Sequence, residues 1–382
     1  MGYNSNVVVC RNEVIIEGVN VGQFESFTLK ADRRTFGATA VLTLPLYAIG
    51  VETPTSKGRA SARVRRTLLD TNNKLNIKVC AEVEVYCWYD GYEKIRVFHG
   101  FIEHVAEGFP STLYLRDASF ILRFGTIDKA WEGDVRLQTI AEKCVKVSQK
   151  AFEQERKSLG FTRSIAPLTY TNKGNNVQAV TTPISFDNFA SGRAPFEVVQ
   201  YLMQLLVLYA GVDNDNNLYI GAGVQDSTRP VIKLSTKYNV VGRNIVPTDG
   251  RFVDYDVKVT GVLKNGKKFT ATGGLKNARS AESSSALDKV TGETYRGYSL
   301  ANTQTGIQDT ADRLLARLKG TYNKGTITLL MYPKCQLLDH VDYDDTVFDI
   351  YDAKYYVTGY TFSASERGYF QTLEITDRVF ML

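Results

Sequence analysis

The chain has 382 residues, of which 43% are hydrophobic and 23% are charged, and its formal net charge is +5. This length is enough for two or three domains with cores of their own. The mild charge argues against a strong nucleic-acid binder or a membrane-surface protein, which would carry a concentrated basic patch. The 22 Tyr and 19 Phe residues favour β structure.

The cysteines and apolar segments indicate where the protein is made. The five cysteines contain no CxxC pair and leave one residue over, so we expect neither a disulfide framework nor a cysteine-rich zinc site. The N-terminus lacks the basic and apolar regions of a signal peptide. The longest apolar run, residues 201–212, is too short and too interrupted to span a bilayer. We therefore expect synthesis in a reducing cytoplasm and no membrane insertion by this chain.

Short strands open the chain. Residues 7–16, 24–31 and 36–46 are rich in apolar and β-branched residues and are bounded by glycine or charged turns. Strands resume at residues 82–89 and give about six in total, enough for a small closed barrel without exposed edges. We predict a first β-barrel domain over residues 1–125.

A polar and basic insertion, residues 53–67, interrupts these strands. It has no apolar period that would fold it alone, so we predict a long loop. A flexible basic run can bind a polyanion by releasing counterions from phosphates, but a solvated loop or a contact with an acidic protein surface is favoured. The basic residues of this predicted contact loop are Lys57, Arg59, Arg63, Arg65 and Arg66.

The middle of the chain is expected to be helical. An apolar stripe that begins at Val135 predicts a helix with Asp134 as its N-cap. A second helix is predicted over residues 196–210, and residues 212–221 indicate two strands joined by an Asn/Asp turn. We predict an α/β middle domain, residues 126–235, of two helices and a hairpin.

A second β region fills residues 236–382 and is predicted as a second β-barrel domain. It contains a flexible insertion, residues 264–291, in which Asn265 and Gly266 suit a hairpin turn. An amphipathic helix is predicted over residues 308–319. The predicted strands lie near residues 239–246, 252–263, 325–332, 346–351, 355–362 and 369–376.

A strand with glycine at its middle, a turn, and a strand that ends in aspartate occur twice in the chain. Gly100 and Asp117 mark the first copy and are 17 positions apart, whereas Gly359 and Asp377 mark the second and are 18 apart. We expect the two glycines to let barrel strands bend. The repeat predicts a mainly β (α+β) fold, with two similar small β-barrels separated by the α/β domain.

Few residues suit catalysis. His99 and His104 lie in one predicted strand at positions of opposite parity, so their side chains point to different faces. Asp117 and Asp377 have the chemistry of a glycosidase pair, but solvation of the ends of two similar strands explains them better. Cys144 lies on an apolar helix face and is expected to be a core residue rather than a nucleophile.

One cluster resembles a metal site. Asp339, His340 and Asp342 are close enough in sequence to bind a hard cation, although a solvated acidic turn between strands is favoured. Residues 213–217 lack the glycine and glutamate that an EF-hand requires, and no phosphate loop or zinc-protease motif occurs. We expect no cofactor, no metal and no enzymatic activity.

Four segments together resemble a known family: residues 14–44, 98–105, 194–221 and 355–375. In this order, with a duplicated β region, they resemble the baseplate or tail-tip hub proteins of phage tails. This group includes the late-control protein D family of contractile phages and the hub parts of type VI secretion spikes.

The resemblance implies a homotrimer in which each chain provides two similar barrels, so that three chains build a ring of six. Such a ring would join the sixfold tail tube to a threefold central spike, contact neighbouring baseplate proteins and let DNA pass. It would lie in the virion tail, after assembly in the cytoplasm of the bacterial host. The chain ends at Leu382 without an appended spike, lysozyme or toxin domain, so we expect a separate spike protein.

Two alternatives remain open from the residues alone. The first is a β-rich carbohydrate-binding or adhesion module, which would present aromatic residues on exposed strands. The second is a metal-dependent hydrolase that uses Asp339, His340 and Asp342.

Overall fold

The computed structural model describes residues 9–33, 35–45, 47–50, 64–67, 77–106, 111–128, 134–171, 183–185, 191–205, 209–213, 215–221, 231–249, 255–273, 293–299, 301–318, 321–337, 339–346 and 353–377. Within these ranges the protein is mainly β with a few helices, so the predicted mainly β, α+β fold is confirmed. No helix among them is long and apolar enough to cross a membrane.

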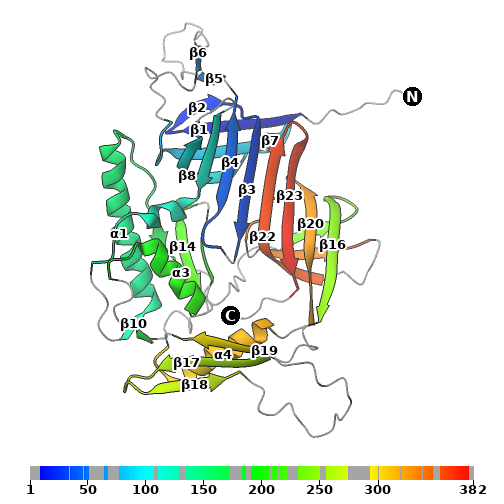
Figure 1. Cartoon of the computed structure of the whole chain (residues 1–382). Coiled ribbons are helices and arrows are strands. Elements are labelled where there is room, and N and C mark those ends of the chain that lie inside the picture. Colours follow the sequence, from blue (N-terminus) through cyan, green and yellow to red (C-terminus); the bar gives the residue numbers. More distant parts are fainter. Residues whose placement is uncertain are drawn as a thin grey trace.

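A thirteen-stranded sheet dominates the structure. Its main path runs β16-β20-β23-β22-β3-β4-β9-β8-β7-β1-β2. Outside this path, β21 pairs with β22, and β15 pairs with β21. Figure 1 shows the middle of this path as neighbouring strands from β16 to β4. The strands are β1 (Cys10–Ile16), β2 (Val19–Gly22), β3 (Ser26–Asp32), β4 (Thr39–Leu44), β7 (Glu82–Tyr89), β8 (Ile95–Ala106), β9 (Ser111–Arg116), β15 (Ile232–Ser235), β16 (Val240–Asp249), β20 (Thr321–Leu330), β21 (His340–Asp344), β22 (Ala353–Ser365) and β23 (Gly368–Thr376).

Alternating apolar and polar residues give this sheet one buried face. In β3, Phe27 and Leu29 are buried, whereas Thr28 between them is exposed. One core underlies the N-terminal strands, and a second, which includes Ile327 and Leu373, underlies the C-terminal strands. Each β region therefore has its own core, although the pairing of β3 with β22 joins their strands into one sheet. The boundaries of the three predicted domains stay a prediction.

Helix α1 (Leu137–Ser158) confirms the first predicted helix. Its stripe of Leu137, Ile140 and Cys144 is fully buried, as expected of core residues. The predicted N-cap is wrong. Asp134 instead lies in β10 (Asp134–Arg136), which pairs with β12 (Pro183–Ser185), so its backbone is committed to a strand before the helix begins.

The second predicted helix ends earlier than expected. Helix α3 (Pro195–Leu205) is followed by β13 (Tyr209–Val212), which pairs with β14 (Asn217–Gly221). Burial of Tyr209, whose hydroxyl lies 2.8 Å from that of Tyr219 on β14, accounts for the extended backbone where helix was predicted. The predicted Asn/Asp turn is confirmed, since the Asp213 carboxylate accepts hydrogen bonds from turn amides. Strand β11 (Thr169–Tyr170) lies parallel to β14.

A smaller unit interrupts the second β region. Strands β17 (Tyr255–Val262), β18 (Lys268–Thr272) and β19 (Glu293–Tyr298) form a separate sheet covered by α4 (Gln304–Leu318), which Figure 1 shows below the large sheet. The prediction of β17 as a barrel strand is therefore wrong, and part of the predicted flexible insertion is the strand β18. The hairpin turn at Gly266 is confirmed, with a positive φ of 75°.

Two predicted loops contain strands. Strands β5 (Tyr47–Gly50) and β6 (Val64–Thr67) form an antiparallel pair, so Arg65 and Arg66 lie on a strand rather than in a long loop. Lys57, Arg59 and Arg63 lie outside the described residues. The acidic segment that was predicted as a turn is the strand β21, which pairs with both β15 and β22.

A candidate assembly surface on the shared sheet

The two β regions meet along β3 and β22. Six residue pairs join these strands, from Gly359 opposite Asp32 to Ala364 opposite Phe27. The first part of β22 instead pairs with β21, as far as Tyr356. Strand β22 thus changes its outer partner at the middle of its length, and its second half connects the C-terminal β region to the N-terminal one.

The exposed face of the shared sheet is rich in hydroxyl groups. One row of directly opposed residues crosses five strands in the order Thr328, Thr372, Thr361, Lys30 and Thr39. The hydroxyls of Thr328 and Thr372 lie 3.3 Å apart. Since the opposite face is packed with apolar side chains, the row is the water-facing side of the sheet.

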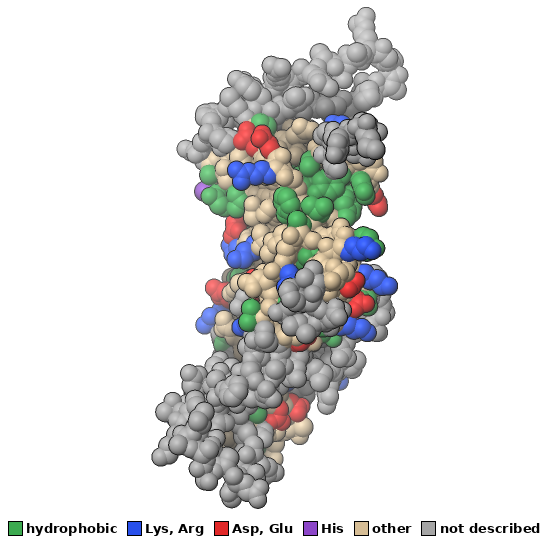
Figure 2. Space-filling model, turned by 90° about the vertical axis from the view of Figure 1, so that its right-hand side faces the viewer, with side chains coloured by type: hydrophobic (Ala, Val, Ile, Leu, Met, Phe, Trp, Pro, Cys, Tyr) green, Lys and Arg blue, Asp and Glu red, His purple; other side chains and the backbone are tan. Residues whose placement is uncertain are grey.

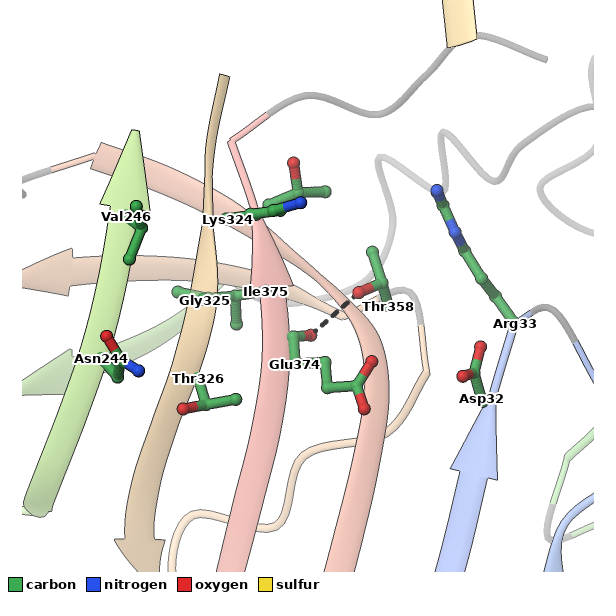
Figure 3. A pocket seen from close by; sticks show the side chains of 11 residues that line it. Asp32, Arg33, Asn244, Val246, Lys324, Gly325, Thr326, Thr358, Glu374 and Ile375 are labelled. Carbon is green, nitrogen blue, oxygen red and sulfur yellow. Dashed lines mark hydrogen bonds between the residues drawn. The ribbon is translucent and has the colours of Figure 1, made fainter. Parts of the chain in front are cut away.

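A shallow hollow of about 400 Å³ lies at the end of this face and is lined by residues of β3, β22, β23, β20 and β16. Figure 3 shows the carboxylates of Asp32 and Glu374 and the basic side chains of Arg33 and Lys324 around it, and the Thr358 hydroxyl donates to the Glu374 carbonyl oxygen at 3.2 Å. Two acidic and two basic side chains leave the hollow close to neutral. The remaining lining residues are Asn244, Val246, Gly325, Thr326, Ile375 and Thr376.

Asp117 and Asp377 perform the same structural task in the two β regions. The Asp117 amide donates to the Ala38 carbonyl oxygen at 3.1 Å, and its carboxylate accepts from the Ala38 amide at 2.7 Å. The Asp377 amide and carboxylate bind Asn323 in the same way, at 3.1 and 3.0 Å. Solvation of strand ends is therefore the wrong explanation, because each aspartate fixes the start of a neighbouring strand. Burial raises the pKa of Asp117, although hydrogen bonds from Ala38 and Ser119 oppose the rise.

The register of the strands relates the two β regions residue by residue. The Ile102 amide donates to the carbonyl oxygen of Ala81, just before β7, at 2.9 Å, and the Val357 amide donates to the carbonyl oxygen of Asp339, just before β21, at 3.0 Å. The next pairing step is irregular in both hairpins, between Ile102 and His104 and between Val357 and Gly359. In the first β region, His104 therefore occupies the position that Gly359 has in the second β region.

The predicted correspondence of Gly100 with Gly359 is consequently displaced by four residues. A Cβ atom at Gly100 would lie 2.2 Å from the Arg116 carbonyl oxygen, which is part of the backbone. A Cβ atom at Gly359 would meet the movable Glu374 carboxylate at 3.1 Å. That these glycines let the strands bend stays a prediction.

The other residues considered for chemistry lie apart. His99 is buried, with Nε2 at 3.0 Å from Glu82, whereas His104 is exposed, with its ring 5.7 Å from that of Tyr114. The prediction that the two histidines point to different faces is wrong, because the irregular step between Ile102 and His104 turns His104 to the face of Phe101 and His99. Burial opposes ionisation of Glu82, but the hydrogen bond and charge of His99, with nearby arginines, hold the pKa of Glu82 below its usual range.

The predicted acidic cluster has structural contacts. The Asp339 carboxylate accepts from the Gln336 amide at 2.6 Å, and the His340 ring packs edge-on against Tyr356. In the part of the chain that the structure describes, no group of three or more His, Cys, Asp or Glu side chains could hold a metal ion.

One charged network was not anticipated from the sequence. The side chain of Arg156, 3% exposed, donates to both carboxylate oxygens of Glu17 at 2.8 and 3.0 Å and to the Cys80 carbonyl oxygen. It anchors the end of α1 to the first β region. The i, i+4 spacing from buried Phe152 is the only pattern in the sequence that places Arg156 on the inner face of the helix.

Solved structures of other proteins have a similar arrangement of sheets. A tail protein from Neisseria meningitidis MC58 matches with a TM-score of 0.59 and 15% identity, over 96% of each chain. The 43 kDa tail protein of prophage MuSo2 from Shewanella oneidensis matches with a TM-score of 0.54 and 15% identity, over 97% of this chain and 98% of that one. This chain has the fold of phage tail proteins. The resemblance drawn from the sequence is confirmed at that level.

A secretion-system component has the same tail-protein fold. The E. coli c3393 protein, a type VI secretion component described as similar to bacteriophage T4 tail proteins gp27 and gp5, matches with a TM-score of 0.52 and 10% identity, over 96% of this chain and 77% of that one. No protein-family model matches the sequence, and no curated protein does.

Proposed function

We propose that the chain is a structural, non-enzymatic hub in the baseplate or tail tip of a phage or a phage-derived injection machine. In this proposal it forms a homotrimer that joins the tail tube to a central spike and contacts neighbouring baseplate proteins. The observation that carries the proposal is the shared sheet, in which two similar β regions are paired edge to edge within one chain. Three such chains would present six similar sheet units, which suits a sixfold tube on one side and a threefold spike on the other.

The hydroxyl-rich face of the shared sheet is proposed to line the channel of this ring. Threonine side chains present polar groups without net charge, and the hollow at the end of the face carries balanced charges. Such a wall neither attracts a polyanion strongly nor repels it. This property suits the passage of DNA, which must enter and leave without being retained.

The basic residues Lys57, Arg59, Arg63, Arg65 and Arg66 are proposed to contact an acidic surface of a neighbouring tail protein. Replacing Arg65 and Arg66 by glutamate would test this contact. The variant should bind the partner baseplate protein more weakly than the unaltered chain does. Binding of the unaltered chain should itself weaken as salt is raised. Equal binding by the two forms would contradict the contact.

The oligomeric state tests the central proposal. Native mass spectrometry and light scattering should give three times the chain mass of 42.7 kDa, and electron-microscopy class averages should show rings with six similar wall units. Mixing with the tube protein encoded in the same gene cluster should produce capped tubes. A monomer at high concentration, with no ring in the presence of the tube protein, would contradict the proposal.

The adhesion alternative makes a different prediction. The exposed tyrosines of the described structure, Tyr92, Tyr114, Tyr238 and Tyr298, belong to four different strands or turns. Binding to a glycan array without association with a tube protein would favour adhesion over the hub.

A further inference from the structure

The small sheet of β17, β18 and β19 has two different faces. Helix α4 covers one of them and shares a core with the strands. This core includes Val257, Val259, Ala271, Ile307 and Leu314. Because successive strand residues point to opposite faces, the residues between these core positions point away from the helix. Their side chains are exposed or half-buried, and we call this side of the sheet the bare face.

The register of the strands arranges the bare face in three rows that run from β18 through β17 to β19. The first row is Thr272, Lys258 and Arg296, the second is Thr270, Thr260 and Tyr298, and the third is Lys268 and Val262. The first and third rows are separated by about 13 Å along the strands. Basic side chains thus lie at both ends of the bare face, and an aromatic ring lies between them.

The charge of the bare face has a single sign. Of its eight side chains, Lys258, Lys268 and Arg296 are basic and exposed, and none is acidic. The hairpin turn beyond the third row adds Lys264 and Lys267, which are also exposed. Among the described side chains in Figure 2, by contrast, basic and acidic groups lie next to one another. The mild net charge of +5 for the whole chain therefore hides a local concentration of cations.

The first row of the bare face suits a phosphate group. Lys258 and Arg296 are directly opposed on neighbouring strands. Like charges in this arrangement repel each other and destabilise a sheet, whereas an anion bound beside both of them offsets the repulsion. In the next row the hydroxyls of Thr260 and Thr270 lie 3.0 Å apart. Hydroxyl groups of this kind donate hydrogen bonds to phosphate oxygens, as lysine and arginine do.

Tyr298 distinguishes between the kinds of polyanion that these cations would attract. Its side chain is 71% exposed, although it lies on a paired strand directly beside Thr260. An exposed aromatic ring on a basic sheet offers a surface on which a nucleobase can stack. In a duplex the bases already stack on one another, and an acidic protein surface has no bases, so neither partner would use the ring in this way.

We propose that the bare face of the small sheet binds single-stranded nucleic acid. A base stacks on Tyr298, and the phosphates on either side of it contact Lys258 and Arg296 at one end and the lysines of the hairpin at the other. A strand that crosses the three rows meets cations at both ends and the ring between them. This binding activity goes beyond the proposed hub function and does not depend on the trimer.

Fluorescence anisotropy of the full chain with a labelled oligothymidine of about 12 nucleotides tests the two kinds of contact separately. Tyr298→Ala should weaken binding by about 5- to 150-fold, because one base loses its stacking surface, whereas Tyr298→Phe should bind as the unaltered chain does. Lys258→Gln with Arg296→Gln should also weaken binding. It should lower the slope of log affinity against log salt by about 1.4, since two phosphate contacts are lost at about 0.7 each. Tyr298→Ala should leave this slope unchanged.

The matched control is Lys150→Gln with Lys157→Gln, two exposed positions on α1, which removes the same charge and should leave the affinity unchanged. Thermal unfolding should show that Tyr298→Ala and Tyr298→Phe are equally folded. Equal affinity of these two variants for the oligonucleotide would overturn the proposal, and so would its absence of binding to the unaltered chain. Tighter binding of a duplex of the same length, of polyglutamate or of phosphatidylglycerol vesicles would instead assign the bare face to that partner and likewise overturn it.

Discussion

Lys334 is a nearly buried cation at the contact between the two β regions. Its ammonium group donates to the carbonyl oxygen of Arg96 on β8 at 2.6 Å. Burial, followed by the charge of Arg96, lowers the pKa of Lys334 from 10.5 to about 8. The folded protein thus loses a proton from Lys334 at a pH where the unfolded chain still holds it.

This shift predicts a rise in stability with pH. Between about pH 8 and 10.5 the unfolded state binds more protons at Lys334 than the folded state, so its contribution to the free energy of unfolding increases with pH, by at most about 3 kcal/mol. Lys334→Met removes this contribution. Burial holds the pKa of cysteines such as Cys144 and tyrosines such as Tyr170 above this range in the folded state, whereas the same groups titrate within it in the unfolded chain. The quantity to measure is therefore the difference in the free energy of unfolding between the unaltered protein and Lys334→Met, from urea unfolding at pH 7 to 10.5. Parallel stability curves would contradict the assignment.

Gly100 and Gly359 differ in what surrounds them, and their substitution should differ accordingly. Gly100→Ala forces a methyl group against the Arg116 backbone and should destabilise the fold by about 3 kcal/mol or more, since neither strand of the hairpin can yield. Gly359→Ala meets the Glu374 carboxylate at 3.1 Å, which can rotate away, and the Ala31 carbonyl oxygen at 3.3 Å, which requires only a small shift, so a smaller loss of about 1 kcal/mol is expected. Thermal unfolding of the matched pair measures both, and equal losses would show that local space does not distinguish the sites.

At the scale of elements, one ion pair connects the edge strand β16 to the body of the protein. Arg243 of β16 forms a salt bridge with Asp345, which is fully buried and also accepts from the Tyr343 hydroxyl at 3.3 Å. Breaking a buried pair from one side leaves a charge without compensation in a region of low polarity. The position of β16, and hence its edge, depends on this contact.

Asp345→Ala should therefore cost about 3–5 kcal/mol and loosen β16 selectively. Hydrogen exchange followed by mass spectrometry should show lost protection in residues 240–249 before the rest of the sheet. The control is Asp342→Ala on neighbouring β21, a partly exposed position where about 1 kcal/mol or less is expected. Equal protection of β16 in the two variants would show that the ion pair does not hold the strand.

Elements that depend on local patterns were predicted well from the sequence. Helix α1 follows from its apolar stripe, and the β22–β23 hairpin follows from two aromatic, β-branched runs around a glycine turn. What failed depends on partners distant in sequence. Strand β17 looked like a barrel strand because its alternation does not reveal which sheet it joins, and β21 looked like an acidic turn because its buried residues alternate with aspartates.

The candidate surface shows the same division between local and distant information. The repeat of Asp117 and Asp377 could be read from the sequence, and the structure gives both residues the same hydrogen bonds. The pairing of β3 with β22 could not, because it joins residues more than 300 positions apart and depends on an irregular step in the ladder. The predicted correspondence of the glycines failed for another reason: His104 is 13 positions before Asp117 whereas its counterpart Gly359 is 18 before Asp377, because the second hairpin has longer arms.

At the scale of the whole molecule, the duplicated β region gives each chain two copies of every wall position. Thr28 of β3 and Asn244 of β16 are equivalent by register, and both are exposed on the hydroxyl-rich face. In the proposed trimer these residues would form a ring of six side chains around the channel. Changing both in one chain therefore changes the electrostatic potential of the whole circumference.

The variant Thr28→Glu with Asn244→Glu should assemble normally but hinder DNA. Six carboxylates at one level of a narrow channel repel phosphates, and the low polarity of the protein wall strengthens the effect. We expect particles of normal mass and appearance whose DNA ejection in vitro is slowed tenfold or more at low salt and recovers as salt is raised, since screening weakens the repulsion. The matched control is Thr28→Gln with Asn244→Gln, which changes size but not charge. If the two variants eject DNA at the same rate while both assemble, the face does not line the path of the DNA, and the channel must be assigned to another surface of the ring.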